Sequence, residues 1–314
     1  MPNVTNNTRI FLIGANGQVG QAWRDLLTDD QLVGAVDRQS LDLSELDELA
    51  DRLMNCLQPH LEPHWQQSQP LVIVNAAAYT AVDQAQDHEQ QAYDINALAP
   101  GIIAEVAARL QISLIHYSTD YVFDGHGQQA FVESDTPAPL SVYGRSKLAG
   151  ERAVAAAGGA HLIFRTSWVF GVHGQNFLKT MLRLAQERDS LSVVDDQIGA
   201  PTPAALLAQV PFDILQQLQS QQDARWGLYH LCPTHDTSWH GYACYLIHRA
   251  RALGWPIRVA EHAIKAVGSS EFPVKATRPH NSRLCTQKLQ DAFGVNLPTW
   301  QSGVDHVLAQ LGKQ

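Results

Sequence analysis

Short apolar runs alternate with longer amphipathic stretches through the first half of the chain. The apolar runs occupy residues 9–13, 32–36, 71–74 and 113–117, and runs of this length suit strands that are buried on both faces. Helical spacing of apolar positions is found at residues 18–27, 43–57 and 92–110. Strands that alternate with helices predict βαβ units, and therefore a parallel sheet covered by helices on both faces.

The second half of the chain has a less regular pattern. A helix that carries Tyr143 is expected to run to the Gly158-Gly159 pair, and a strand is expected at His161–Arg165. Further helices are expected around residues 176–187, 204–219 and 240–252, with an extended piece at 228–232. Residues 58–70 look like an insertion before the third strand, and we expect them to form a surface loop.

These patterns predict an α/β fold with two parts. We expect residues 1–165 to form the domain with the parallel sheet, and segments near 190–220 to return to it. Residues 166–314 are expected to form mainly a smaller C-terminal α/β domain that binds the substrate. A length of 314 residues agrees with one large and one smaller domain.

Composition and charge narrow the classes of function. Apolar residues make up 45% and charged residues 17%, as in ordinary folded proteins. A net charge of -9 argues against a nucleic-acid partner, because phosphate binding needs clustered Lys and Arg. No apolar run approaches the roughly 20 residues that span a membrane, and the N-terminus does not resemble a signal peptide. With four scattered cysteines, the expected location is the cytoplasm.

A glycine-rich turn joins the first predicted strand to the first predicted helix. It reads Gly14-Ala15-Asn16-Gly17-Gln18-Val19-Gly20, a G-x-x-G-x-x-G spacing. Free backbone N–H groups at a helix N-terminus, together with the helix dipole, bind anions such as a pyrophosphate. Glycines in such a turn can also serve backbone geometry alone. Following a strand and opening a helix, the turn favours a Rossmann-type doubly wound sheet that binds a dinucleotide.

Residues after the second and third strands extend this predicted cofactor site. Asp37 ends the second strand, where a carboxylate can accept hydrogen bonds from the adenosine ribose and favour NAD. The adjacent Arg38 could instead pair with a 2'-phosphate and favour NADP, so the choice between NADH and NADPH stays open. Asp42 and Leu43 could flank the adenine, although Asp42 also suits a helix cap. Small residues at Ala76, Ala77 and Ala78 let a cofactor pass close to the backbone.

Candidate chemistry lies on the helix after the fourth strand. Tyr143 and Lys147 are four residues apart and therefore share one face of a helix, and Thr119 follows the fourth strand. An ammonium near a phenol stabilises the phenolate, and lowering a phenol pKa from 10 to 7 takes roughly 4 kcal/mol. Tyr-x-x-x-Lys alone is a common pattern. Combined with the glycine turn, it indicates a nicotinamide-dependent enzyme that moves a hydride and a proton.

The glycine spacing, Ser118-Thr119 and Tyr-x-x-x-Lys resemble the extended short-chain dehydrogenase/reductase superfamily. Longer runs at 116–123, 142–151, 165–169, 196–202 and 278–284 resemble the dTDP-4-dehydrorhamnose reductase family nearly end to end. The resemblance implies reduction of the C4 ketone of dTDP-4-dehydro-β-L-rhamnose by NADPH or NADH, the last step in making this donor for cell-surface polysaccharides. It also implies that Tyr143 protonates the carbonyl oxygen, Thr119 hydrogen-bonds that oxygen, and Lys147 binds the nicotinamide ribose.

The same resemblance assigns further ligand contacts. Asp120 joins Thr119 at the sugar, and Trp168 either packs on the ligand or lies in the core between the two domains. At least one of Arg278 and Arg283 is expected to help to hold the diphosphate or to order the C-terminal segment, and the alternative is that they form surface salt bridges. The cofactor contacts implied by the resemblance are Gly17, Gln18, Val19, Asp37, Asp42, Leu43, Ala78, Tyr79 and Thr80.

The resemblance leaves metal and oligomeric state open. Some family members hold magnesium with acidic residues at a subunit contact, and Ala22 stands where one of those acids is expected. We therefore assign no metal ligand, and a homodimer remains open.

Two other kinds of function stay as alternatives. Related 4,6-dehydratases place an Asp-Glu pair directly after the Thr, whereas this chain has Asp120-Tyr121, which argues against dehydration. A 4-epimerase or another nucleotide-sugar reductase would also use the Tyr and the Lys. A non-catalytic regulatory subunit, like the β subunit of methionine adenosyltransferase, uses a similar scaffold. The intact Thr119, Tyr143 and Lys147 favour an enzyme.

Overall fold

A parallel sheet of six strands organises the computed structural model, which describes residues 8–62, 70–218 and 223–312. The strand order is β10-β5-β4-β3-β1-β2, and all the pairs are parallel. The strands are β1 (Arg9–Ile13), β2 (Leu32–Val36), β3 (Leu71–Asn75), β4 (Ser113–Thr119), β5 (His161–Thr166) and β10 (Gly227–His230). Because β1 lies between β2 and β3, the strand order reverses there, and ligands bind at the carboxyl ends of strands at such a point.

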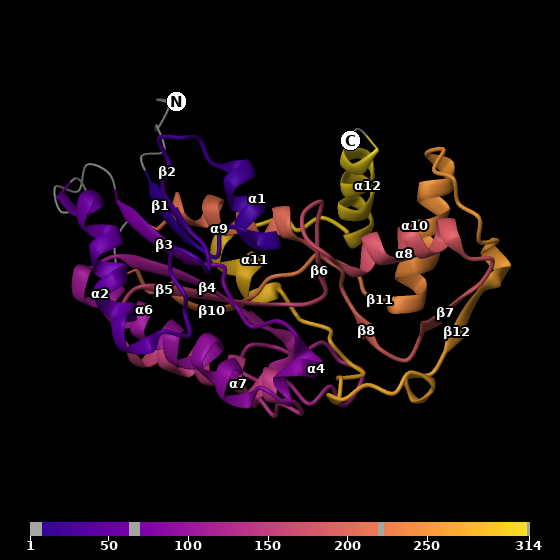
Figure 1. Cartoon of the computed structure of the whole chain (residues 1–314), viewed down its shortest axis with the longest axis horizontal. Coiled ribbons are helices and arrows are strands. Elements are labelled where there is room, and N and C mark those ends of the chain that lie inside the picture. The colour runs from indigo at the N-terminus through magenta and orange to yellow at the C-terminus, as the bar shows by residue number, and fades with distance from the viewer. Residues whose placement is uncertain (1–7, 63–69, 219–222, 313–314) are drawn as a thin grey trace.

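Helices cover both faces of the sheet (Figure 1). Alternate residues of β1 point to opposite faces: Phe11 and Ile13 belong to one apolar cluster, Ile10 and Leu12 to the other. The first cluster includes helices α2 (Leu46–Leu57), α6 (Ala99–Leu110) and α7 (Val142–Ala156). The second includes α1 (Gln18–Leu26), α9 (Ala204–Leu215) and α11 (Gln287–Phe293). This three-layer arrangement confirms the predicted doubly wound α/β fold.

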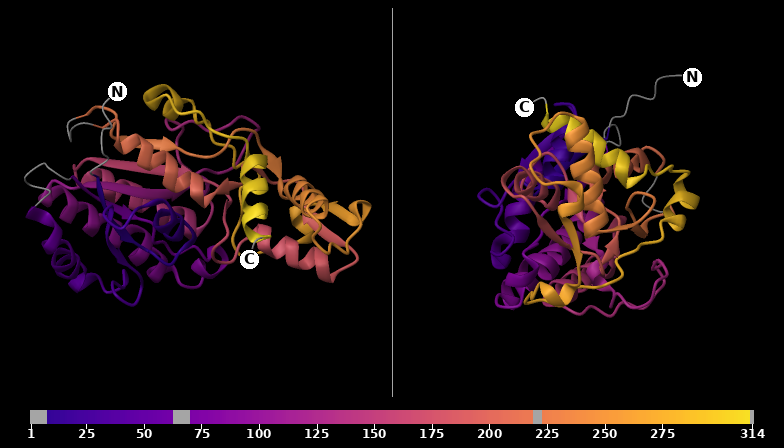
Figure 2. Two further views of the ribbon diagram at one scale, coloured as in Figure 1. Left: turned by 90° about the horizontal axis from the view of Figure 1, so that it is seen from above. Right: turned by 90° about the vertical axis from the view of Figure 1, so that its right-hand side faces the viewer.

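A smaller lobe, which we call the small lobe, lies at one end of the sheet domain (Figure 2). It has its own apolar clusters. Its helices are α8 (Phe177–Glu187), α10 (Trp239–Ala252) and α12 (Trp300–Leu311), and β7 (Leu191–Val194) pairs with β12 (Ile264–Val267). Two-residue strands link the parts: β6 (Val169–Phe170) pairs with β9 (Thr202–Pro203), and β8 (Ile198–Gly199) pairs with β11 (Thr237–Ser238). Since α9, β10 and α11 all return to the large sheet, the chain passes between the two parts several times. The predicted domain boundaries stay a prediction.

Short helical segments complete the description and refine one expectation. They are η1 (Gln58–His60), α4 (Val82–Ala85), α5 (Glu89–Tyr93), η2 (Asp94–Leu98), η3 (Asp120–Val122), η4 (Glu261–Ala263) and η5 (Ser269–Glu271). The helix expected at 92–110 is thus divided by η2, which has π-helical geometry.

The prediction of a surface loop at residues 58–70 is wrong for the first residues of that range. Gln58–His60 continues α2 as a 3₁₀-helix, because Leu57 and Leu61, one helical turn apart, are both buried in the apolar cluster. Residues 63–69 of that expected loop lie outside the described residues.

Within the described ranges, no helix is both long enough and apolar enough to cross a membrane.

Candidate active site

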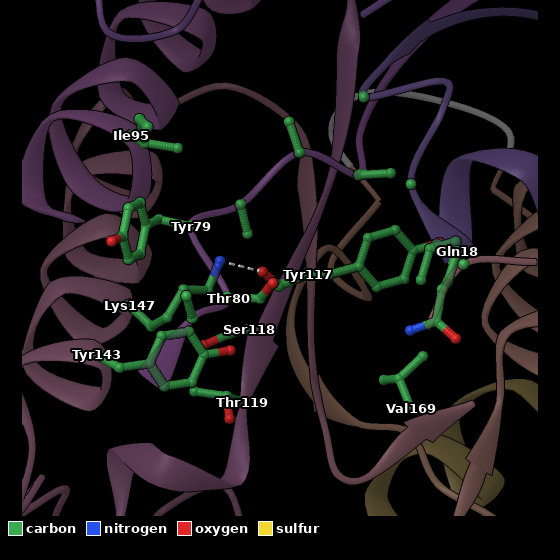
Figure 3. A pocket seen from close by; sticks show the side chains of 18 of the residues that line it. Gln18, Tyr79, Thr80, Ile95, Tyr117, Ser118, Thr119, Tyr143, Lys147 and Val169 are labelled. Carbon is green, nitrogen blue, oxygen red and sulfur yellow. Dashed lines mark hydrogen bonds between the residues drawn. The ribbon is translucent and has the colours of Figure 1, made fainter. Parts of the chain in front are cut away.

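A cavity of about 890 Å³ opens at the carboxyl ends of the central strands. Figure 3 shows Tyr143, Lys147 and Thr119 at one end of it and Gln18 and Val169 at the other. The residues predicted from the sequence that line it are Gly14, Gly17, Gln18, Val19, Asp37, Arg38, Asp42, Leu43, Ala76, Ala77, Ala78, Tyr79, Thr80, Thr119, Asp120, Tyr143, Lys147 and Trp168. The structure therefore brings nearly all of the predicted site residues to one space. Gly20 and Arg278 are not in that lining.

The glycine turn packs tightly against the strand ends. Gly14 has a φ of 83°, and a Cβ there would lie 2.6 Å from the amide nitrogen of Ala77. A Cβ on Gly20 would collide with the carbonyl oxygen of Gly14, so Gly20 shapes the turn without lining the cavity. Gly17 caps α1 without a side-chain hydrogen bond, which leaves the first-turn amides of Gln18 and Val19 to face the cavity. This cradle fits a dinucleotide pyrophosphate.

At the predicted adenosine end of the cavity, the Asp37 carboxylate accepts hydrogen bonds from neighbouring protein groups. Asp37 Oδ2 accepts a hydrogen bond from Asn16 Nδ2 at 2.6 Å. Its Oδ1 accepts from the backbone amides of Gln39 and Ser40 at 3.0 and 3.1 Å. The Arg38 side chain is 72% exposed, and its Nε lies 3.2 Å from Asp42 Oδ2. The guanidinium thus presents further N–H donors at the rim, where a 2'-phosphate could pair with them.

Helix α7 aims the candidate catalytic side chains at the end of β4. Ser141 caps the helix, since its Oγ accepts from the Gly144 amide at 3.1 Å. A Cβ on Gly144 would collide with the carbonyl oxygen of Tyr121, so this glycine permits α7 to lie against η3. Tyr143 and Lys147 therefore share the inner face of the helix, as their spacing predicts (Figure 3).

Burial raises the pKa values of two side chains at this end of the cavity, Tyr143 and Asp120. Burial raises the pKa of Tyr143 to about 12, and a hydrogen bond with Thr119 opposes that rise. Thr119 Oγ1 accepts from the Tyr121 amide at 3.2 Å and donates to Asp120 Oδ1 at 3.1 Å. Burial also raises the pKa of Asp120 to about 6, with hydrogen bonds from Ser282 and Thr119 opposing it. Because its pKa is about 12, Tyr143 is protonated at neutral pH and can act as a proton donor.

Lys147 is buried to the same degree as the core around it. Its side chain is 2% exposed, and Nζ donates to the Tyr117 carbonyl oxygen at 2.6 Å. Burial lowers its pKa to about 8, against the attraction of the nearby Glu151 carboxylate. An amine with this pKa exchanges protons readily at physiological pH.

Asn96 lies behind the cavity lining, and the sequence did not reveal its contacts there. It is fully buried in the π-helical segment η2. Its Oδ1 accepts from the Tyr79 amide at 2.8 Å, and its Nδ2 donates to the Tyr79 carbonyl and to Ser146 Oγ, both at 3.0 Å. Asn96 therefore holds the loop after β3 against α7, and π-helical segments often occur at functional sites.

Trp239 is a second residue that sequence reasoning missed. The first residue of α10, it stacks on Trp168 with ring centroids 3.7 Å apart and an interplanar angle of 14°. Both rings line the cavity. Trp168 has a φ of 49°, an unusual value for a bulky residue that often marks a functional site. Trp168 thus faces the cavity and also packs between the two parts of the molecule.

Arg278 lies apart from the cavity in this structure. Its Nη2 donates to Asp83 Oδ2 at 2.8 Å, which ties the C-terminal segment to α4. Its role at the diphosphate stays a prediction. Across residues 8–62, 70–218 and 223–312, no group of three or more His, Cys, Asp or Glu side chains is arranged to hold a metal ion.

The fold and the cavity define a class of protein. A glycine turn where the strand order reverses, joined to a Thr, a Tyr and a Lys in one cavity, is the arrangement of extended short-chain dehydrogenases/reductases that use NAD(P). A family model described as "RmlD substrate binding domain" matches residues 8–313.

Comparisons with individual proteins identify the family. A dTDP-4-dehydrorhamnose reductase of Escherichia coli K12 is 48% identical over 242 residues, covering 77% of this chain and 80% of that protein. The Burkholderia thailandensis enzyme of the same name is 40% identical over 300 residues, covering 94% and 96%. A crystal structure of the Bacillus anthracis enzyme in complex with NADP superposes with a TM-score of 0.84 at 32% identity, covering 96% and 99%. The chain belongs to the dTDP-4-dehydrorhamnose reductase family, which confirms the resemblance found in the sequence.

Proposed function

We propose that this chain reduces the C4 ketone of dTDP-4-dehydro-β-L-rhamnose to dTDP-β-L-rhamnose, with NADPH or NADH as the reductant. The observation that carries the proposal is a single cavity with a pyrophosphate cradle at the glycine turn and Thr119, Tyr143 and Lys147 at the other end. The product would serve as a sugar donor for cell-surface polysaccharide.

The protein's own residues would supply the proton for the reduction. The nicotinamide, when bound, supplies a hydride to C4. Tyr143 donates its phenolic proton to the C4 oxygen as negative charge develops, because a pKa of about 12 keeps the phenol protonated. Thr119 Oγ1 turns from Asp120 to donate a hydrogen bond to the same oxygen. The Lys147 ammonium then stabilises the phenolate.

Substrate recognition would use the other side chains at this end. Asp120 can accept hydrogen bonds from sugar hydroxyls, and the Trp168–Trp239 stack offers an aromatic surface for the apolar side of a pyranose. Arg278 would have to leave Asp83 before it could contact a diphosphate. These substrate roles are proposals that mutagenesis can test one residue at a time.

The environment of Tyr121 favours reduction over elimination of water. A 4,6-dehydratase needs a second carboxyl group at this position, whereas the Tyr121 ring packs edge-on against Tyr143, with centroids 5.6 Å apart. Burial raises the pKa of Tyr121 far above neutrality, so it cannot serve as a base. No contact among the described residues favours the regulatory-subunit alternative.

The test is an assay of turnover with a purified product. Protein, NADPH and enzymatically generated dTDP-4-dehydrorhamnose should consume the reduced cofactor and yield dTDP-rhamnose, identified by NMR. Tyr143→Phe should lose this activity. Tyr245→Phe, on α10 and bonded to Asp305, should keep it. No turnover by the native chain, or equal turnover by Tyr143→Phe, would refute the proposal.

Four further tests accompany this proposal. Repeating the assay with NADH gives the cofactor preference, and adding a chelator tests the magnesium requirement that the sequence left open. A homodimer would appear as a doubled mass in native mass spectrometry. A cytoplasmic location would appear by fractionation of the source cells.

A further inference from the structure

His116 is a buried histidine on β4 that lies between the core of the sheet and Lys147. Its Nε2 is 3.5 Å from Lys147 Nζ, and its Nδ1 is 3.3 Å from Asn75 Nδ2. Both His116 and Asn75 are almost completely shielded from solvent. Of these three residues, Lys147 alone is among the described residues that line the cavity, so any effect of His116 on a ligand would have to pass through Lys147.

The hydrogen bonds of Asn75 determine the tautomer of His116. Asn75 Oδ1 accepts from the Ala77 amide at 3.2 Å, which turns the NH₂ group of Asn75 toward His116. Because that NH₂ group can only donate, His116 Nδ1 must accept, and a neutral imidazole then carries its proton on Nε2. Burial, and then the charge of Lys147, hold the pKa of His116 well below its ordinary value, so the ring is neutral. An N–H group therefore points at Lys147 Nζ.

We propose that His116 is a positioning residue: held as the Nε2–H tautomer by Asn75, it orients the Lys147 amine and disfavours its ammonium form. This inference rests on the proposed function. The ammonium finds an acceptor in the Tyr117 carbonyl, 2.6 Å away, but none at His116. Its remaining N–H groups are thereby directed toward the cavity, where Tyr143 lies.

The arrangement assists the return of a proton to Tyr143. After Tyr143 has given its proton to the substrate, an N–H bond of Lys147 breaks and an O–H bond forms on the Tyr143 phenolate. Neutral Lys147 is left with a lone pair on Nζ that can accept a hydrogen bond from His116 Nε2–H. Lys147 later recovers its proton from solvent. The His116 contact thus stabilises the form of Lys147 that exists after this transfer.

Other charged groups near Lys147 also affect whether it carries a proton. Glu151, on the same helix, favours the ammonium, although its carboxylate also accepts from Arg165 on β5 and from Ser118 on β4. The remaining titratable groups on the elements packed around Lys147 and His116 are Tyr143, Arg145 and Arg152 on α7, Tyr117 on β4, Tyr121 and Asp120 on η3, His161 on β5, Asp83 on α4, Glu89 and Tyr93 on α5, Asp94 on η2, and Glu105 and Arg109 on α6. Of these, His161 acts on His116 and further disfavours its charged form.

The test is the pH profile of His116→Gln. A glutamine can turn its Oε1 toward Lys147 and accept from the ammonium, so the alkaline limb of kcat should move up by about one pH unit, which is tenfold in proton affinity. KM should stay unchanged because His116 is outside the cavity lining. Ile115→Val, also buried on β4, is the matched control and should leave the limb in place. An active His116→Gln enzyme with an unmoved limb would overturn the inference and leave the proposed function intact.

A measurement on the unaltered protein protects the test against a variant that fails to fold. NMR of the ¹⁵N-histidine-labelled protein distinguishes the two neutral tautomers from the imidazolium. His116 should be the Nε2–H tautomer from about pH 6 to 8, the range around an unperturbed histidine pKa. An Nδ1–H tautomer or a charged ring would refute the inference, whether or not the protein turns over the nucleotide sugar.

Discussion

Replacing Glu151 by Gln should both destabilise the protein and change its pH profile. The Glu151 and Arg165 side chains are 6% and 3% exposed, and they form two hydrogen bonds, with Arg165 Nε at 2.9 Å and Nη2 at 2.7 Å. Ser118 Oγ donates to the same carboxylate, and the Arg165 guanidinium also lies 5.0 Å from the Phe123 ring centroid. A neutral amide leaves the Arg165 charge buried without a counter-charge.

The magnitude follows from this burial. Removing one partner of a buried ion pair costs about 3 to 5 kcal/mol, and we expect the lower end because the amide oxygen of the introduced glutamine could still accept one hydrogen bond from Arg165. Loss of the carboxylate also removes the attraction that favours the Lys147 ammonium. The pKa of Lys147 should then fall below about 8, and the alkaline limb of kcat should move to lower pH.

Two measurements and one control variant test these predicted effects of Glu151→Gln. Urea unfolding gives the change in free energy, and initial rates across pH give the limb. Glu187→Gln breaks the Arg183–Glu187 pair on α8, whose side chains are 60% and 53% exposed, and should cost at most about 0.5 kcal/mol. Equal losses of stability for the two variants would show that the Glu151–Arg165 pair contributes no more than a surface pair. An upward shift of the limb would contradict the electrostatic argument.

Three further predictions concern the cavity. Arg38→Ala should raise KM for NADPH at least about tenfold and leave KM for NADH nearly unchanged, because only the former carries a 2'-phosphate; equal effects on both cofactors would contradict this. Gly144→Ala should lower the melting temperature and kcat, since its Cβ would collide with the Tyr121 carbonyl oxygen; wild-type values for both would show that α7 moves freely. Burial raises the folded-state pKa of Asp120 from 3.8 to about 6, so the folded form binds the proton more tightly. Relative to Asp120→Asn, the native chain should therefore lose stability as pH rises from about 4 to 6, and parallel stability curves would refute that.

The sequence predicted the parts of the site that depend on local position along the chain. The carboxyl ends of parallel strands meet at one edge of a sheet, so Gly14, Asp37, Ala76 and Thr119 had to lie near one another once the strands were recognised. Four-residue spacing likewise placed Tyr143 one turn from Lys147.

The parts that the sequence could not predict depend on contacts between distant residues. Trp239 meets Trp168 only because α10 of the small lobe returns to the cavity, and no pattern around either residue indicates that return. Asn96 reads as one polar position in an apolar helix, and its function appears only when the loop at Tyr79 lies beside it. The loop expected at residue 58 is wrong for a simpler reason, since the Pro and Gln residues at its start suggest a loop more strongly than the buried Leu61 suggests a helix.

Two residues on one face of β4 have opposite effects on the proton affinity of Lys147. Side chains alternate along a strand, so His116 and Ser118 point to the α7 side, whereas Tyr117 points to the opposite side and donates to the Leu207 carbonyl. His116 faces the Lys147 amine directly, and Ser118 holds the Glu151 carboxylate one turn further along α7. The first contact disfavours the ammonium and the second favours it, so the proton affinity of Lys147 depends on how rigidly α7 lies against a single strand. Any substitution that tilts α7 should therefore change the pH profile, even when it touches neither cofactor nor substrate.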